Sequence, residues 1–299
     1  MSVGLPDPIM LEWEQARSER GAARRARLRY VLARLRRSPT FLVGAALVLF
    51  WVIAALGWRV IAPHDPYEFD ALATLKGPSS AHWFGTDDIG RDVLSRVIAG
   101  AAPVLTVAPL ATLLGLALGT TVGLFSGYYR GFVDDVIMRI VDAFLSFPTI
   151  IVAVVALALL GPSRLNLIVT VAILFAPLIA RTVRSAVLGE RERAYVEAAR
   201  MRGERGVHVM FVEILPNITS PIVVEGTIRL GYAVFTAATL AFLGFGSQPP
   251  SPDWGLTIAL ERTFVQIAWW TVMFPALALA SLVVGINLVA DGLRRALAP

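Results

Sequence analysis

The sequence contains no cysteine and a single lysine, Lys76, which lies between Leu75 and Gly77. Without cysteine, the chain has no disulfides, thiolate metal sites or thiol nucleophiles. The phosphate-binding loop of nucleotide-binding proteins requires a glycine before its lysine and a serine or threonine after it. Lys76 has neither neighbour, so this chain does not bind ATP in that manner. Any ATP-driven work must use nucleotide sites on another chain.

Charge is also scarce, since charged residues make up 16% of the 299 residues and hydrophobic residues make up 56%. The mean hydropathy of +0.67 is too high for an ordinary soluble domain. A net charge of +5 is compatible with nucleic-acid binding. The basic residues, however, gather in short segments beside apolar runs, which is typical of membrane proteins. We therefore expect contacts with membrane lipid and no nucleic-acid partner.

Apolar runs set the expected architecture. A helix needs roughly 20 apolar residues to cross a bilayer. The first run is longer than the hydrophobic part of a secretory signal peptide, so we expect it to remain as a span. The sequence predicts an all-α membrane protein with six transmembrane helices, near residues 40–62, 99–127, 133–160, 165–188, 219–245 and 268–290.

The distribution of arginine predicts the orientation of these helices. Residues 1–38 carry nine arginines and four acidic residues, whereas the loop 63–97 has three basic and six acidic residues. Within the basic segment, Ala22–Arg37 has the spacing of an amphipathic helix lying on the inner membrane surface. Basic segments stay in the cytoplasm, so both termini are expected there. The expected divisions are 1–39, 40–62, 63–97, a core at 98–290 with a cytoplasmic loop at 189–217, and a tail at 291–299.

The cytoplasmic loop is arginine-rich and is predicted to form two short helices. Good helix formers occupy Arg191–Arg202, Gly203 interrupts them, and Val207–Leu215 resumes the helix until Pro216 ends it. Small side chains at Ala198 and Ala199 would let another protein approach the first helix closely, and Glu197 offers a carboxylate to a cationic partner. The alternative is a solvated linker between two spans.

This loop resembles the EAA signature of permease subunits of bacterial ABC importers. The matching residues are Glu197, Ala198, Ala199, Gly203, Leu215 and Pro216. The resemblance extends over nearly the whole chain. Segments similar to the shorter, C-type permease of the dipeptide/oligopeptide/nickel branch occur at His82–Arg96, Gln248–Pro250 with Trp254–Gly255, and Asp291–Arg294.

The resemblance implies a type I ABC importer permease in the bacterial inner membrane. Such a chain forms half of a translocation pathway and pairs with a second, non-identical permease. Two separate subunits bind ATP and Mg and dock on the six signature residues, and an extracytoplasmic binding protein delivers substrate. The implied cargo is a di- or oligopeptide, with nickel or glutathione as alternatives. The resemblance also suggests an outer gate or partner contact at Gly85, Thr86, Asp87, Gly90, Arg91 and Asp92. The alternative is that this segment is only a well-capped helix entering the second span.

Charged residues in the third apolar run allow a different function. Asp135 and Asp142 lie one helical turn to either side of Arg139. They are expected to form pairs within the helix, or else to line the pathway or contact the second permease. In an ion-coupled secondary carrier, the rival function, they would relay protons. No constellation of His, Cys or paired carboxylates indicates a catalytic site. The three histidines are isolated in the sequence, so no metal site is predicted either.

Overall fold

The computed structural model describes residues 29–297, and within them the regular structure is helical, apart from one isolated bridge between Thr86 and Asp92. Four helices are long and apolar enough to cross a membrane. They are α2 (Pro39–Ile61), α3 (Val93–Tyr129), α6 (Arg164–Glu190) and α11 (Trp270–Leu297). Two bent helix pairs raise the number of candidate spans to six.

The first bent pair forms the third predicted span. Helices α4 (Gly131–Leu145) and α5 (Thr149–Leu160) meet at 86°. The break includes Pro148, which has no N–H to continue a helical ladder. In the second pair, residues 206–217 meet α9 (Thr219–Phe242) at 72°. All six apolar runs therefore form helix, and the bend follows the Phe147-Pro148 step of the sequence.

Two expected boundaries differ from the structure. The loop predicted at 63–97 ends at Asp92, whose side chain accepts a hydrogen bond from the Ser95 N–H and caps the start of α3. With 37 residues, α3 is about 55 Å long and exceeds the ~30 Å hydrocarbon layer. At the other end of the chain, α11 continues to Leu297, so the predicted tail is helical as far as it is described.

The start of the chain is described only in part. Residues 29–36 are helical, which agrees with the end of the predicted amphipathic helix, and residues 1–28 lie outside the described residues. Ser38 then caps α2 by accepting a hydrogen bond from the Phe41 N–H, and Pro39 occupies the first helical position.

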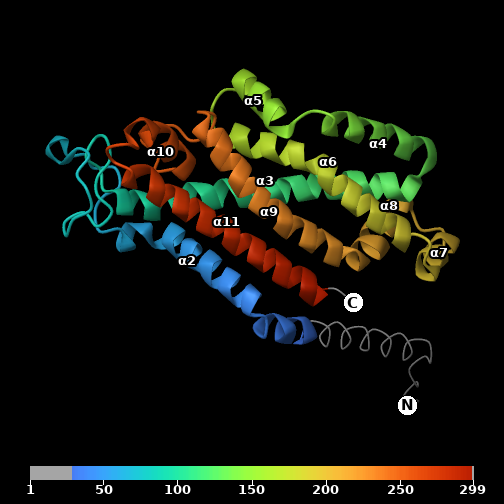
Figure 1. The fold of residues 1–299 in the computed structure, drawn as a ribbon. Coiled ribbons are helices and arrows are strands. Elements are labelled where there is room, and N and C mark those ends of the chain that lie inside the picture. Colours follow the sequence, from blue (N-terminus) through green and yellow to red (C-terminus); the bar gives the residue numbers. More distant parts are fainter. Residues whose placement is uncertain (1–28, 298–299) are drawn as a thin grey trace, which may run out of the picture.

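The helices form an elongated bundle in which α3 runs along the middle (Figure 1). Helices α2 and α11 pack together, as do α3 and α6. One end of the molecule carries residues 63–92, α10 (Trp254–Glu261) and the connections beside it, and is named the loop end. The opposite end carries α7 (Ala194–Met201) and α8 (Gly206–His208), and is named the α7 end.

Close packing of small residues joins α3 to α6. Glycines recur every four residues along α3, and a Cβ added at Gly119 would lie 2.6 Å from the Ala176 carbonyl oxygen and from the Ile179 Cβ. Such residues let helix backbones approach closely, which drives association where lipid removes the hydrophobic advantage. Glycines at positions 115, 119, 123 and 127 form this contact.

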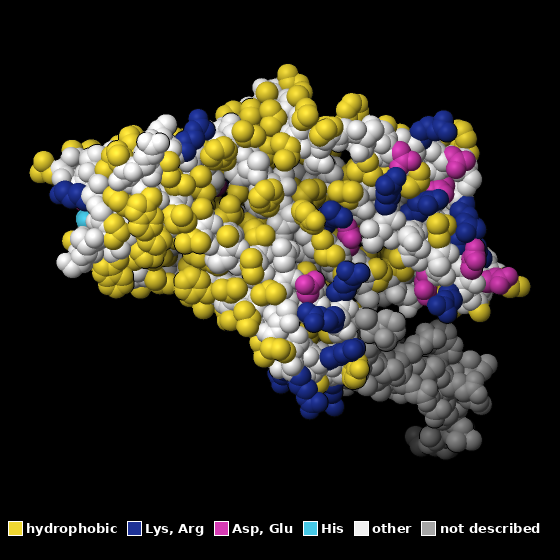
Figure 2. All heavy atoms as spheres, viewed as in Figure 1, with side chains coloured by type: hydrophobic (Ala, Val, Ile, Leu, Met, Phe, Trp, Pro, Cys, Tyr) yellow, Lys and Arg dark blue, Asp and Glu magenta, His cyan; other side chains and the backbone are white. Residues whose placement is uncertain are grey.

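The surface has an apolar middle and charged ends. Hydrophobic side chains cover the middle of the molecule, whereas charged side chains gather at the α7 end and near the end of α11 (Figure 2). Large apolar residues such as Leu56, Val60 and Leu159 are exposed. A contiguous apolar surface of this kind requires lipid or a partner protein to cover it.

Candidate functional site

The α7 end contains the predicted break between two helices. Helix α7 ends at Met201, and Gly203 has a φ of +76°. The Gly203 N–H donates to the Arg200 carbonyl, and the Glu204 N–H donates to the Ala199 carbonyl. This is the Schellman arrangement, in which glycine is favoured because it adopts a left-handed conformation without steric cost. Gly203 therefore ends the helix, and no neighbouring atom restricts the space around it.

Helix α7 is held firmly against its own chain. Val196 and Ala199 are completely buried. The Arg200 guanidinium lies 4.9 Å from the centroid of the Tyr128 ring, and the Tyr195 hydroxyl donates a 3.1 Å hydrogen bond to Glu190. Burial and this hydrogen bond raise the pKa of Tyr195 to about 12, so its hydroxyl remains a donor at physiological pH. These contacts orient α7 without help from another protein.

The expected docking residues consequently fall on different sides of α7. Glu197, Ala198 and Met201 are exposed, whereas Ala199 faces the interior. The expectation that Ala199 gives a partner close access is therefore wrong for this chain, because its methyl group already packs against the chain's own core. Pro216 is exposed and Leu215 is half-buried farther along the same end. The name α7 surface is used below for Glu197, Ala198 and Met201.

The segment after Gly203 is irregular and bears both charge and exposed apolar residues. A short π-helix spans Val209–Ile214, and Leu215–Asn217 follows as a 3₁₀ turn. Arg202 donates hydrogen bonds of 2.7 and 2.9 Å to Glu204. Val207, Phe211 and Val212 are exposed nearby. The α7 end thus presents exposed apolar side chains together with charged ones, a mixture that protein interfaces commonly contain.

Two aspartates of the third apolar run pair with arginines of α6. Arg181 of α6 donates a 2.5 Å hydrogen bond to Asp142 of α4. Arg184 of α6 donates hydrogen bonds of 2.6 and 2.5 Å to the buried Asp134, which also accepts from the Ser126 hydroxyl. Within the described residues, no ion pair joins Arg139 to either of the aspartates around it, at 135 and 142. The expected pairs within one helix are therefore not formed: Asp142 pairs with Arg181 of α6 instead, and Asp135 is exposed.

The predicted outer-gate residues come together at the loop end. Thr86, Asp87, Arg91 and Asp92 are all buried, and the Arg91 Nε donates a 2.6 Å hydrogen bond to Asp87. A Cβ at Gly90 would lie 1.9 Å from the Asp70 carbonyl oxygen, so only glycine fits there. These side chains hold the chain's own loops together. A partner would contact the surface that they support rather than the side chains themselves.

Long-range hydrogen bonds extend this network to the later loops. Arg96 donates to the carbonyl oxygens of Pro66 and Ser251, at 3.1 and 3.2 Å. Its nearest carboxylate is that of Asp87, 3.5 Å from its Nε. The indole of Trp254 donates to the Val97 carbonyl at 2.9 Å. The two loop regions and the start of α3 therefore form one buried unit.

Glu261 is an unusual member of this unit. Its side chain lies in the interior, and neither carboxylate oxygen has a hydrogen-bond partner within the described residues. Asp87, Asp88 and Glu261 each place a carboxylate oxygen within 4.8 Å of the others. Burial, followed by the effect of the neighbouring Asp88, raises the pKa of Glu261 to about 8. Burial therefore favours the protonated form of Glu261 at neutral pH.

Two of the three histidines also meet at the loop end. The Nδ1 atoms of His82 and His64 lie 3.0 and 3.6 Å from the same oxygen, Oδ1 of Asp92. Their ring centroids are 4.8 Å apart. Sequence spacing gave no sign of this cluster, because the residues are separated by loops whose folding brings them together. His208 lies at the α7 end, 3.6 Å from Glu204.

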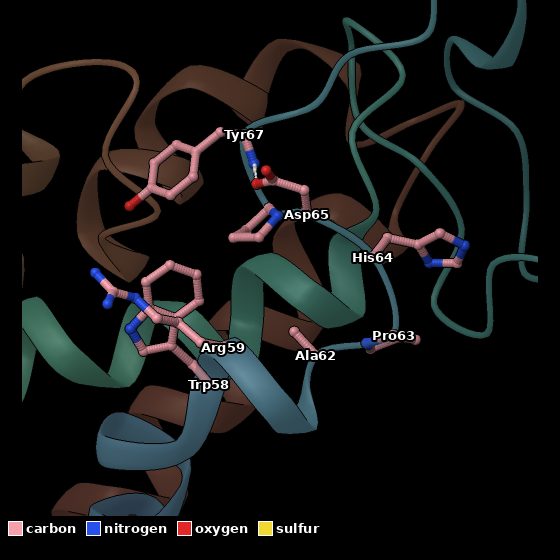
Figure 3. Close-up of a pocket in the computed structure, with 8 residues that line it drawn as sticks. Trp58, Arg59, Ala62, Pro63, His64, Asp65 and Tyr67 are labelled. Atoms are coloured by element: carbon pink, nitrogen blue, oxygen red, sulfur yellow. Dashed lines mark hydrogen bonds between the residues drawn. The ribbon is translucent and has the colours of Figure 1, made fainter.

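A pocket of about 410 Å³ lies beside His64, at the end of α2 (Figure 3). Trp58, Arg59 and Tyr67 line it, and the Tyr67 N–H donates a 2.9 Å hydrogen bond to Asp65. The imidazole of His64 points away from these three side chains. His64 therefore contributes backbone to the pocket, while its ring belongs to the cluster with His82.

Comparison with known families gives two matches. The family described as binding-protein-dependent transport system inner membrane component matches residues 119–299. The N-terminal TM domain of oligopeptide transport permease C matches residues 27–78. These matches include α2, part of α3 and all later helices.

Two similar curated proteins are permeases. The chain is 39% identical over 271 residues to the dipeptide transport system permease protein DppC of Alkalihalophilus pseudofirmus, covering 91% of this chain and 89% of that protein. It is 41% identical over 261 residues to the glutathione transport system permease protein GsiD of Pectobacterium atrosepticum, covering 86% of each chain.

A solved structure shares the fold. In an inward-facing crystal form of the MetNI methionine ABC transporter, one chain matches with a TM-score of 0.56 and 23% identity. The match covers 68% of this chain and 97% of that chain. It places the helices described here in the permease fold of ABC importers.

Proposed function

Because the chain belongs to the family of binding-protein-dependent transport system inner membrane components, we propose that it couples small-peptide import to ATPase subunits docked on its α7 surface. It is a multi-pass permease subunit of an ATP-driven importer and not an enzyme. The chain has no P-loop lysine, so ATP and Mg belong to partner subunits. Membership of this family argues against the rival function, an ion-coupled secondary carrier.

The proposed cargo is a di- or oligopeptide. The two permeases compared above are named for dipeptide and glutathione transport, and glutathione is itself a tripeptide. Both names therefore point to short peptides rather than to nickel. Identifying the ligand that co-purifies with the binding protein of this importer by mass spectrometry tests the assignment. Recovery of a metal ion without peptide would contradict it.

The observation that carries the coupling proposal is the exposed α7 surface on a firmly held helix. Glu197, Ala198 and Met201 are free while Val196 and Ala199 anchor the same helix to the core. A rigid helix can pass a movement of its partner to the bundle, whereas a loosely tethered one would absorb it. Coupling then requires only that the ATP-bound and nucleotide-free states of the ATPases prefer different permease conformations.

The remaining partners follow from the same assignment. We place the α7 end and both termini in the cytoplasm, because arginine is concentrated there. The loop end then faces the binding protein outside the membrane. Two ATP-binding subunits and a second, non-identical permease complete the pathway, of which this chain forms half. The exposed apolar side chains of α4 and α5 are available for lipid or for the second permease.

The coupling proposal is tested by placing bulk on the α7 surface. Ala198→Trp adds a large ring at an exposed position without filling space inside the chain. We expect the importer to lose peptide uptake and to lose its ATPase subunits on purification. Glu197→Ala should do less, because it removes a single charged contact worth roughly 1.5–3 kcal/mol when desolvated.

The matched control is Ala71→Trp, the same change at an exposed position of the loop end. It should retain the ATPase subunits, and both variants should insert and pair with the second permease. Wild-type uptake with full retention of the ATPases by Ala198→Trp would show that the α7 surface is only a solvated linker.

A further inference from the structure

The cluster of His64, His82 and Asp92 combines ligands from three separate parts of the chain. His64 lies just beyond the end of α2, His82 lies within the loop that follows, and Asp92 caps α3. The Nδ1 atoms of His64 and His82 lie 3.6 and 3.0 Å from one carboxylate oxygen. Only the His82 distance is that of a hydrogen bond, so hydrogen bonding to Asp92 does not account for the position of the second imidazole.

The distances fit a transition-metal ion. A tetrahedral zinc ion with bonds of about 2.0–2.2 Å holds its ligand atoms about 3.3–3.6 Å apart. Of the two nitrogen-to-oxygen separations, 3.6 Å lies at the upper end of that range and 3.0 Å lies slightly below it. One donor atom of each residue lies within 4.8 Å of the others.

The surrounding groups already orient these ligands. The second oxygen of Asp92, Oδ2, accepts hydrogen bonds of 2.8 and 2.7 Å from the N–H and hydroxyl of Ser95. The Ser95 Oγ also accepts a 3.0 Å hydrogen bond from the His64 N–H. Ser95 is completely buried, so it fixes the aspartate and the backbone of one histidine together. Such outer contacts fix the direction of ligands in metal sites.

Solvent can reach the cluster from one side. The side chains of His64 and His82 are 42% and 23% exposed, whereas that of Asp92 is 1% exposed. An ion held between them would have a buried carboxylate behind it and room for water in front. Two imidazoles and one carboxylate suit zinc, copper or nickel better than calcium or magnesium, which prefer oxygen ligands.

From this geometry we infer that His64, His82 and Asp92 bind a divalent transition-metal ion at the loop end. The ion joins the chain after α2 to the first turn of α3. An ion held by the Nδ1 atoms takes their lone pairs, so the ring proton of each neutral imidazole is carried on Nε2. The site is separate from the α7 surface and does not depend on how ATPases dock there.

The test measures zinc bound by the full chain within its importer complex, purified with a tag that contains no histidine. The chain has three histidines and no cysteine, so each possible nitrogen ligand can be removed singly. Equilibrium dialysis against buffered zinc, followed by metal analysis, compares wild type with His64→Ala and His82→Ala. His208→Ala is the matched control, because this histidine lies with Glu204 and Glu213 at the other end.

We expect His82→Ala to bind one zinc ion per chain fewer than wild type and His208→Ala. In His64→Ala we expect the zinc affinity to fall about tenfold or more. Added zinc should raise the thermal unfolding temperature of wild type and not of His82→Ala. Replacing zinc by calcium should remove the difference between the variants. Equal zinc binding by wild type and both loop-end variants would overturn the inference. Loss in His82→Ala with unchanged affinity in His64→Ala would also overturn the three-residue site.

Discussion

The carboxyl group of Glu261 lies in the interior of the loop end, and the residue is 1% exposed. An ionised carboxylate there would lose its hydration without gaining a hydrogen bond, and it would be repelled by Asp87 and Asp88. The protonated carboxyl group of Glu261 therefore has a lower free energy in this site than the ionised carboxylate. The loop end is therefore expected to be sensitive to pH through one buried residue.

The pH dependence has a definite sign. The pKa of Glu261 rises from 4.5 to about 8 on folding, so the folded chain binds more protons than the unfolded chain between these values. Stability then falls as pH rises through that window, by at most about 1.4 kcal/mol per pH unit, and is constant above it. Glu261→Gln mimics the protonated form and should flatten thermal unfolding temperature against pH. Exposed Glu68→Gln is the control, and parallel profiles for wild type and Glu261→Gln would contradict the assignment.

Substitutions at Gly203 can distinguish the effect of backbone strain from the effect of side-chain size. Its φ of +76° costs an ordinary residue about 1–2 kcal/mol, whereas asparagine tolerates this conformation better. Gly203→Asn should therefore preserve coupled ATP hydrolysis and peptide uptake more fully than Gly203→Ala, although asparagine is larger. The reverse order would mean that free space at this position, rather than the end of α7, matters for coupling.

At the scale of single residues, the sequence predicted what depends on local chemistry and missed what depends on loop folding. Glycine is a poor helix residue anywhere, so the break at Gly203 was predictable. The meeting of His64 with His82 depends on the path of the loop between them. The burial of Glu261 depends on packing against Asp87 and Asp88, far away in the sequence.

At the scale of helices, the sequence predicted where the helices lie along the chain and did not predict which of their faces turn inward. The six apolar runs predicted the helices, and the bend between α4 and α5 lies at Pro148, which cannot continue a helical hydrogen-bond ladder. Which face of α4 turns inward is decided by packing against α3 and α6. Asp134, which the sequence did not single out, faces Ser126 and Arg184, whereas Arg139 has no ion-pair partner in the part of the chain that the structure describes.

Two ion pairs between α4 and α6 provide a matched comparison. The Asp134–Arg184 pair is 8% and 32% exposed, and the Asp142–Arg181 pair, with the same 2.5 Å contact, is 57% and 55% exposed. Arg184→Ala leaves a buried carboxylate unpaired and should cost stability near the lower end of about 3–5 kcal/mol. Arg181→Ala should cost less than about 1 kcal/mol. Thermal unfolding of the purified complex measures both, and equal losses would show that burial does not distinguish the pairs.

At the scale of the whole molecule, the elongated bundle separates two kinds of surface. The loop end is closed by buried hydrogen bonds among residues far apart in the sequence, whereas the α7 end is rich in exposed charge (Figure 2). The sequence predicted that residues 63–97 and 189–217 lie on opposite sides of a membrane. The structure places these segments at opposite ends of the bundle (Figure 1), as that arrangement requires.

The direction in which the bundle crosses the membrane can be tested with one pair of residues. Leu72 at the loop end and Met201 at the α7 end are both 85% exposed, and the chain has no cysteine to react in the background. A membrane-impermeant maleimide added from outside the inner membrane should label Leu72→Cys and not Met201→Cys. Inside-out vesicles should reverse the pattern, with Met201→Cys protected wherever ATPase subunits remain bound. Labelling of Met201→Cys from the outside would contradict both the arginine-based orientation and the docking of cytoplasmic ATPases at the α7 surface.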